Sequence, residues 1–216
     1  METPIDDALF ADLPSKKYST IAVDPPWDYR DRLGGNRGTN GFGPSINQAK
    51  SGMYPGVRAA ANHYDTLPTE QIARLPVADM AEPNAHIYIW TTNAFMQEAH
   101  DLAVAWGFVP KTIVTWVKTK KGVSEPAAPE DCAFGMGFYY RNMTEHAIFA
   151  VRGRLAPLSH SERNIVFAPV GQHSAKPDAA YDLFARLSPG PRVDLFARTE
   201  RAGWDVWGNQ APEGQK

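Results

Sequence analysis

The sequence predicts an α/β fold built on a largely parallel central sheet with helices on both faces. Short β-branched and aromatic runs alternate along the chain with segments of helical period, an order typical of parallel sheets that leaves room for an antiparallel edge strand. The first run ends in an acid followed by two prolines, and neither proline has a backbone N–H with which to continue a strand. The 216 residues, 43% of them hydrophobic and 21% charged, favour one domain over residues 1–216.

The expected elements follow one another along the whole chain. Strands are expected at residues 21–23, 86–92, 111–117, 146–151, 164–168, 192–197 and 204–207. Helices are expected at 67–76, between two prolines, at 93–107, ending at a glycine, and at 178–187, ending before Ser-Pro-Gly. We expect the tryptophans of the central elements to belong to the core: Trp90, Trp106 and Trp116.

A four-residue motif follows the first strand: Asp24, Pro25, Pro26 and Trp27. Open α/β sheets bind their ligands at the carboxyl ends of strands, where this motif delivers a carboxylate. Since both prolines lack a donor, the bend offers mainly acceptors, which suits a ligand group with two donors such as an exocyclic amine. Trp27 adds a flat surface on which a base can stack, although the motif also fits a rigid turn with a core tryptophan.

Two long irregular segments interrupt the alternation, at about residues 28–63 and 118–143. The first carries five basic and two acidic residues, and loops of this length are often functional, so it is a candidate gate that grips phosphates. The second joins basic and aromatic side chains that are candidates to hold a nucleic-acid backbone and stack bases. The candidates are Lys118, Lys120, Lys121, Tyr139, Tyr140, Arg141 and Asn142.

Composition and motif searches exclude several classes of function. The net charge of −2 gives no global basic field, so nucleic-acid contacts must be local. The chain contains no phosphate-binding loop, no Gly-x-Gly-x-x-Gly after a strand, no Gly-x-Ser-x-Gly elbow and no zinc-ligand spacing, so no metal site is expected. One cysteine and no apolar run long enough to span a membrane favour a cytoplasmic protein.

Eight ordered blocks between Tyr18 and Gln210 resemble the adenine-N6 methyltransferases typified by the catalytic subunit of the messenger-RNA enzyme, and most closely their bacterial and phage branch. Beyond the motif at 24–27, the blocks lie at residues 62–67, 116–119, 141–145, 174–178, 186–190, 194–198 and 208–210. The resemblance implies a Rossmann-like methyltransferase fold and S-adenosylmethionine as cofactor. It also implies a catalytic motif of Asp24, Pro25, Pro26 and Trp27 that holds the target amine.

The resemblance further implies a set of cofactor-binding residues. Lys176 is expected to pair with the cofactor carboxylate, Asp194 to lie near the ribose, and Asn209 to contact the adenosine. The full set is Asp24, Ser174, Lys176, Asp194, Phe196, Arg198, Asn209 and Gln210. The chain departs from the messenger-RNA enzyme after Arg198, where residues 199–201 are Thr-Glu-Arg in place of a stretch containing a histidine and an asparagine.

These observations predict the transfer of a methyl group from S-adenosylmethionine to the N6 amine of adenine in DNA. The amine is a poor nucleophile, and acceptors on its two hydrogens, the Asp24 carboxylate and the Pro25 carbonyl, would offset the developing positive charge. RNA is the alternative substrate, and a catalytically silent nucleic-acid-binding subunit is the alternative class. A monomer or homodimer without membrane association is expected.

Overall fold

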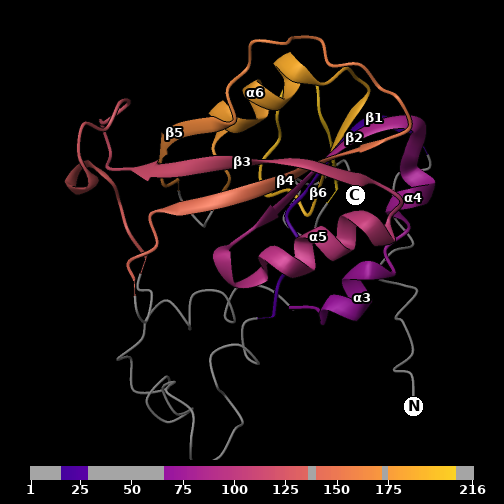
Figure 1. The fold of residues 1–216 in the computed structure, drawn as a ribbon, viewed down its shortest axis with the longest axis horizontal. Coiled ribbons are helices and arrows are strands. Elements are labelled where there is room, and N and C mark those ends of the chain that lie inside the picture. Colours follow the sequence, from indigo (N-terminus) through magenta and orange to yellow (C-terminus); the bar gives the residue numbers. More distant parts are fainter. Residues whose placement is uncertain (1–15, 29–65, 136–139, 172–174, 208–216) are drawn as a thin grey trace, which may run out of the picture.

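A seven-stranded sheet forms the centre of the protein (Figure 1). The structure, a computed structural model, describes residues 16–28, 66–135, 140–171 and 175–207. The strands are β1 (Tyr18–Val23), β2 (Ala81–Thr91), β3 (Val109–Thr119), β4 (Thr144–Arg152), β5 (Ile165–Pro169), β6 (Arg192–Leu195) and β7 (Asp205–Trp207). Their order in the sheet is β5-β3-β4-β2-β1-β6-β7.

The sheet is mixed, and its antiparallel strand lies inside it rather than at the edge where we expected one. Strand β4 runs antiparallel to both neighbours, β2 and β3, whereas the other pairs of neighbouring strands are parallel. The reason is the connection from β3 to β4, which turns back and has no crossover helix in its described parts, 120–135 and 140–143. As a result, β4 begins at the same end of the sheet at which β1, β2 and β3 finish, which we call the carboxyl end.

Helices cover both faces of the sheet, as predicted. On one face lie α3 (Thr69–Ala73), α4 (Val77–Met80) and α5 (Met96–Ala105), and on the other lies α6 (Asp178–Leu187) (Figure 1). The helix expected at 67–76 is shortened to α3, α4 follows after Pro76 as a further helix that was not expected, and the helix expected at 93–107 starts as a 3₁₀ turn at Asn93–Phe95. Each of these breaks occurs where a proline or an early turn interrupts the helical hydrogen bonds.

Two apolar clusters fill the space between the sheet and these helices. Side chains alternate along β1, so that Ile21 packs toward α5 while Ala22 packs toward α6. The three tryptophans expected in the core are each at most 2% exposed. Trp106 lies under α3 and α5, and Trp90 and Trp116 meet edge to face beneath α6.

Strand β1 lies where the strand order reverses, between β2 on one side and β6 on the other. Val23 pairs with Leu195, and the Asp24 N–H donates to the Leu195 carbonyl at 3.2 Å. Ligands of open α/β sheets bind outside the carboxyl ends of the strands at such a switch point. The topology therefore places the 24–27 motif at the position of a ligand crevice.

The connections bear on three further expectations. Of the loop expected at 28–63, residues 29–63 lie outside the described residues. In the second loop a 3₁₀ turn occupies Pro129–Asp131, and bridges join Thr119 to Cys132 and Gly135 to Asn142. In the part of the chain that the structure describes, no helix is both long and apolar enough to cross a membrane, and no group of three or more potential metal ligands occurs.

Candidate active site

The 24–27 motif forms a bend that is fixed by its own backbone. The Trp27 N–H donates to the Pro25 carbonyl at 2.8 Å, and the Leu67 N–H donates to the Pro26 carbonyl at 3.0 Å. A carbonyl oxygen has two lone pairs, so the Pro25 oxygen retains capacity for a second hydrogen bond. The bend thus holds the Asp24 carboxylate and a carbonyl oxygen close together at the carboxyl end of β1.

The indole of Trp27 is part of the core rather than an open surface for a base. It is 5% exposed, it stacks on Phe95 with ring centroids 5.0 Å apart, and its N–H donates to the Trp90 carbonyl at 3.1 Å. The expectation that Trp27 offers a free stacking face is wrong for this conformation, because Phe95 from the 3₁₀ turn before α5 already covers the ring. The contacts of Trp27 anchor the end of the motif.

An alternating row of charges extends from the motif along the carboxyl end of the sheet. The Lys176 ammonium lies 2.7 Å from the Asp24 carboxylate and 3.4 Å from that of Glu145. Glu145 also pairs with Lys118, at 2.5 Å. The four side chains are 10–18% exposed, so they lie just below the surface where ion pairs are only partly screened. We call them the charge row: Asp24, Lys176, Glu145 and Lys118.

The antiparallel course of β4 makes the charge row possible. Glu145 is the second residue of β4, and its neighbour in the register is Trp116 on β3, two residues before Lys118. Because β4 begins where β1 and β3 end, its first residues meet the last residues of those strands. Lys176 reaches the row from the segment before α6.

The ion pairs of the row favour the charged forms of Lys176 and Glu145. Burial disfavours the Lys176 ammonium, but the carboxylates of Asp24 and Glu145 outweigh that effect and raise its pKa above the ordinary value. Burial likewise disfavours ionised Glu145, but Lys176 and Lys118 lower its pKa below the usual range. Two cations and two anions therefore stabilise one another, and the row is neutral overall.

Tryptophan rings lie below both lysines of the row. The Lys176 ammonium is 5.6 Å from the centre of the Trp90 ring, and the Lys118 ammonium is 5.2 Å from that of Trp116. Cation–π contact adds to the preference for charged lysines here. The Trp90 N–H is buried and has no hydrogen-bond partner among the described residues, so it is a donor that a ligand could satisfy.

Asp194 lies below this surface, between β6 and α6. Its side chain is 2% exposed; the Tyr181 hydroxyl donates to one oxygen at 3.0 Å and Arg201 contacts the other at 2.8 Å. Burial raises the pKa of Asp194 to about 7, although Arg201 and Tyr181 act to lower it. Both carboxylate oxygens of Asp194 are therefore engaged inside the protein, and its expected place near the ribose of the cofactor stays a prediction.

The turn after β6 lies beside the end of β1, at the position where the topology predicts a ligand crevice. Phe196 has a φ of 61°, a left-handed conformation that is uncommon for a bulky residue and that clusters at functional sites. Its ring meets Trp207 edge to face at 5.1 Å. Arg198 follows in the same turn, half-buried, and its positive charge acts to lower the pKa of Lys176. This geometry brings Phe196 and Arg198 to the end of β6 beside β1.

The expected substrate-binding residues divide into two groups. Lys120, Lys121 and Tyr140 are exposed, and Arg141 lies 6.0 Å from the centre of the exposed Phe134 ring. Asn142 accepts a 3.4 Å hydrogen bond from Asn93. Lys118 differs, because its ammonium is committed to Glu145 in the charge row. Tyr139, Ser174, Asn209 and Gln210 lie outside the described residues.

Two residues of the site were missed from the sequence. Glu145 is a single acid at the start of an apolar strand, and a charge in such a position indicates a buried partner. Arg201 contacts Asp194 and the Lys176 carbonyl, at 2.8 Å each, yet it stands in an irregular segment without any pattern. The departure from the family's residues at 199–201 is the one signal in the sequence that could have identified Arg201.

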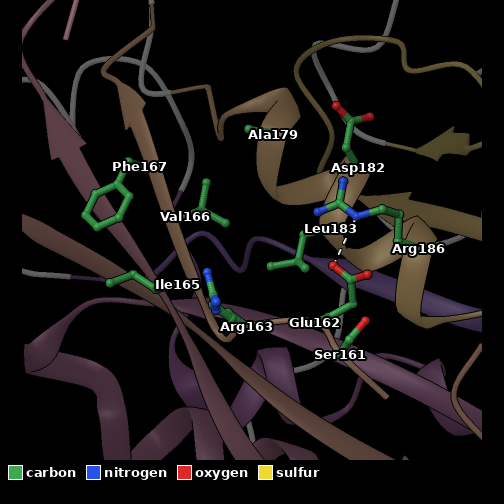
Figure 2. Close-up of a pocket in the computed structure, with 10 residues that line it drawn as sticks. All are labelled: Ser161, Glu162, Arg163, Ile165, Val166, Phe167, Ala179, Asp182, Leu183 and Arg186. Carbon is green, nitrogen blue, oxygen red and sulfur yellow. Dashed lines mark hydrogen bonds and ion pairs between the residues drawn. The ribbon is translucent and has the colours of Figure 1, made fainter. Parts of the chain in front are cut away.

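A surface depression of about 450 Å³ lies elsewhere, between β5 and α6 (Figure 2). Its lining joins apolar β5 side chains such as Phe167 to an ion pair of 3.1 Å between Glu162 and Arg186. None of the charge-row residues lines it. The depression is therefore separate from the crevice at the end of β1.

Comparison with known proteins shows the family of the chain. The MT-A70 family profile matches residues 18–210. The type II methyltransferase M.MunI of Mycoplasma sp is 30% identical over 217 residues, covering 97% of this chain and 84% of that protein. The human N(6)-adenosine-methyltransferase catalytic subunit METTL3 is 23% identical over 198 residues. A putative N(6)-adenosine-methyltransferase MT-A70-like protein of Medicago truncatula is 25% identical over 197 residues.

The two N(6)-adenosine relatives are much longer than this chain. It aligns with 28% of the human protein and 26% of the plant protein, although 90% of its own length is covered in both alignments. The predicted resemblance is confirmed by the profile, which spans all the described strands and helices, and by the Mycoplasma relative. The chain belongs to the MT-A70 family of S-adenosylmethionine-dependent methyltransferases.

Proposed function

We propose that this protein transfers a methyl group from S-adenosylmethionine to the N6 amine of adenine in DNA. The observation that carries the proposal is the Asp24 carboxylate at the switch point, beside the Pro25 carbonyl and 2.7 Å from the Lys176 ammonium. A carboxylate and a carbonyl oxygen on one rigid bend match the two N–H groups of an exocyclic amine.

The chain's own residues would lower the barrier by position and charge. Asp24 and the Pro25 carbonyl would accept the two amine hydrogens and stabilise the positive charge that develops on nitrogen as the new N–C bond forms. One such preorganised group is worth roughly a hundredfold or more in rate. The proton released from the methylated nitrogen would pass toward Asp24 or water, and the contact of 2.7 Å with the Lys176 ammonium would hold the Asp24 carboxylate in place until then.

The residues present fit the cofactor. S-adenosylmethionine supplies an electrophilic methyl group on a sulfonium and carries a carboxylate, an ammonium and a nucleoside. Lys176 offers a cation to the carboxylate, Asp24 an anion near the positive centres, and the Trp90 N–H an unsatisfied buried donor. The turn containing Phe196 and Arg198 borders the same crevice.

The substrate surface would be the exposed part of the segment 120–142. Lys120 and Lys121 would contact phosphates, and Phe134, Tyr140 and Arg141 would stack on unpaired bases beside the target. In a duplex the target adenine must leave the stack to reach Asp24. The buried Trp27 would not stack on a base, because its ring packs on Phe95, and it would instead fix the bend.

DNA is preferred over RNA as the substrate because the sequence resembles the bacterial and phage branch of the family. The chain also aligns with 84% of the type II methyltransferase, against about a quarter of the N(6)-adenosine relatives. RNA methylation is the second candidate, and it is supported by the names of those longer relatives.

Calorimetric titration with S-adenosylmethionine tests the proposal against that of a silent subunit. We expect one site per chain, weakened at least tenfold in Lys176→Met and retained in Asp24→Asn, which should lose transfer activity. Lys111→Met, which removes an exposed lysine at the other end of β3, is the matched control. Failure of the wild-type chain to bind the cofactor would favour the silent subunit.

A further inference from the structure

We infer that Arg201 is a positioning residue for methyl transfer: it holds the main chain at Lys176 so that the ammonium reaches Asp24. The inference concerns the reaction of the proposed function and rests on it in that respect. The anchoring of Lys176 itself is a property of the fold and can be measured without any reaction.

The guanidinium of Arg201 joins three separate parts of the chain. Its three nitrogens donate to the Lys176 carbonyl at 2.8 Å, to Asp194 on β6 at 2.8 Å and to Asp178 at the start of α6 at 3.0 Å. The side chain is only 8% exposed. A planar guanidinium fork spreads its donors over three nitrogens in fixed directions and can reach three separated partners, whereas a lysine presents all its donors from one nitrogen.

Tyr181 completes the environment of Arg201. Its ring centre lies 3.7 Å from the guanidinium carbon, and its hydroxyl donates to Asp194. Stacking and the charge-assisted hydrogen bonds restrict the guanidinium to one plane. We call Arg201, Tyr181, Asp194 and Asp178 the clamp.

The clamp and the charge row meet at a single residue. The carbonyl of Lys176 accepts from the clamp, and its ammonium donates to Asp24. The Lys176 carbonyl accepts from Arg201, and α6 begins two residues later, at Asp178, which Arg201 also contacts. Displacement of this backbone would move the ammonium away from Asp24, and an error of about 1 Å at a reacting group can cost on the order of 100-fold in rate.

The experiment compares Arg201→Gln and Arg201→Lys with wild type. The first removes the charge and the fork, whereas the second keeps a cation near Asp194 but loses the three-way contact. Arg186→Gln is the matched control, since Arg186 is a half-exposed arginine of α6 that pairs with Glu162 in the depression of Figure 2 and makes no contact with the clamp. Circular dichroism and thermal melting establish that each variant is folded.

The first readout is acylation of Lys176 by N-hydroxysuccinimide acetate, quantified by mass spectrometry against exposed Lys111 in the same molecule. Only a neutral, accessible amine reacts, and each unit of fall in its pKa raises the neutral fraction about tenfold. We expect Lys176 to react at least tenfold faster in both Arg201 variants and at the wild-type rate in Arg186→Gln. An unchanged Lys176 rate in the folded Arg201 variants overturns the inference.

The second readout is the separation of kcat from KM. We expect kcat to fall on the order of 100-fold in both Arg201 variants, with a smaller change in KM for nucleic acid. Faster acylation with an unchanged kcat also overturns the inference, because the clamp would then have no effect on the reaction. If Arg201→Gln does not fold, the double variant Arg201→Gln/Asp194→Asn removes the unpaired acid and takes its place.

The two readouts separate this inference from the proposed function. If the wild-type chain transfers no methyl group, the proposed function fails, while the acylation rates still decide whether Arg201 holds Lys176. If wild type is active and the acylation rates do not differ, the proposed function stands and the role of Arg201 is refuted.

Discussion

The pair of Lys118 and Glu145 should be energetically coupled, because neither side chain is open to solvent. They are 18% and 16% exposed and 2.5 Å apart. At an effective dielectric constant of about 20, unit charges at this distance attract by about 7 kcal/mol, most of which is offset by desolvation. A net coupling energy of about 1.5–3 kcal/mol remains, the range of hydrogen bonds to charged groups.

A double-mutant cycle with Lys118→Met and Glu145→Gln measures this coupling. The Glu145 variant removes a carboxylate that contacts two lysines. Its free energy of unfolding should be lower by about 3 kcal/mol, since removing one partner of a buried ion pair is costly. That loss corresponds to a fall of about 6–12 °C in Tm for a chain of this size. The Lys118 variant should lose less, because Glu145 retains Lys176 at 3.4 Å.

Urea unfolding followed by circular dichroism gives the free energy of unfolding of wild type, both single variants and the double variant. We expect the loss of unfolding free energy in the double variant to be smaller than the sum of the two single losses by at least 1.5 kcal/mol. Additivity within about 0.5 kcal/mol would refute the reasoning, since residues that do not interact behave in that way.

Three further predictions concern other parts of the chain. Trp27→Ala should lower the free energy of unfolding in urea by about 3–5 kcal/mol, and Trp27→Phe by much less, because the indole is a core contact. Unchanged stability with lower nucleic-acid affinity would instead show that the ring of Trp27 stacks on the substrate. Burial lowers the pKa of His86 in the folded chain. Between this lowered pKa and the ordinary value near 6.5 the unfolded chain binds more protons than the folded chain, so the free energy of unfolding should fall as the pH falls. The His86→Gln variant should show a flatter pH–stability profile, and an unchanged profile would contradict this. Replacing Lys120 and Lys121 by Gln should reduce the slope of log K against log salt for duplex DNA by about 2, whereas Lys111→Gln should leave it unchanged; equal slopes would remove both lysines from the interface.

The positions of strands and helices were predictable because they depend on local patterns. The runs that contain Ile87 and Ile148 have the apolar character of central strands, and both became central strands of the sheet. The place of β4 was not predictable, because segment 118–143 is long enough for either a crossover or a return, and its residues favour neither. That one reversal decides which side chains meet at the carboxyl end.

The site was predictable in its two halves but not in their connection. Asp24 and Lys176 were each expected in the site. The ion pair between them depends on tertiary structure, because the two residues are separated by 152 positions in the sequence. Glu145 was missed because a lone acid in a strand does not identify its partners. Trp27 was assigned to the substrate because the sequence does not show that Phe95 covers its ring.

The proposed role of Asp24 is to serve methyl transfer to adenine in DNA. The direct measurement is to incubate wild type and Asp24→Asn with labelled S-adenosylmethionine and matched DNA and RNA, then to digest the product and identify the labelled nucleoside. We expect N6-methyladenine in DNA with the wild-type chain and none with Asp24→Asn. Label on another base, label in RNA alone, or wild-type transfer by Asp24→Asn would contradict it.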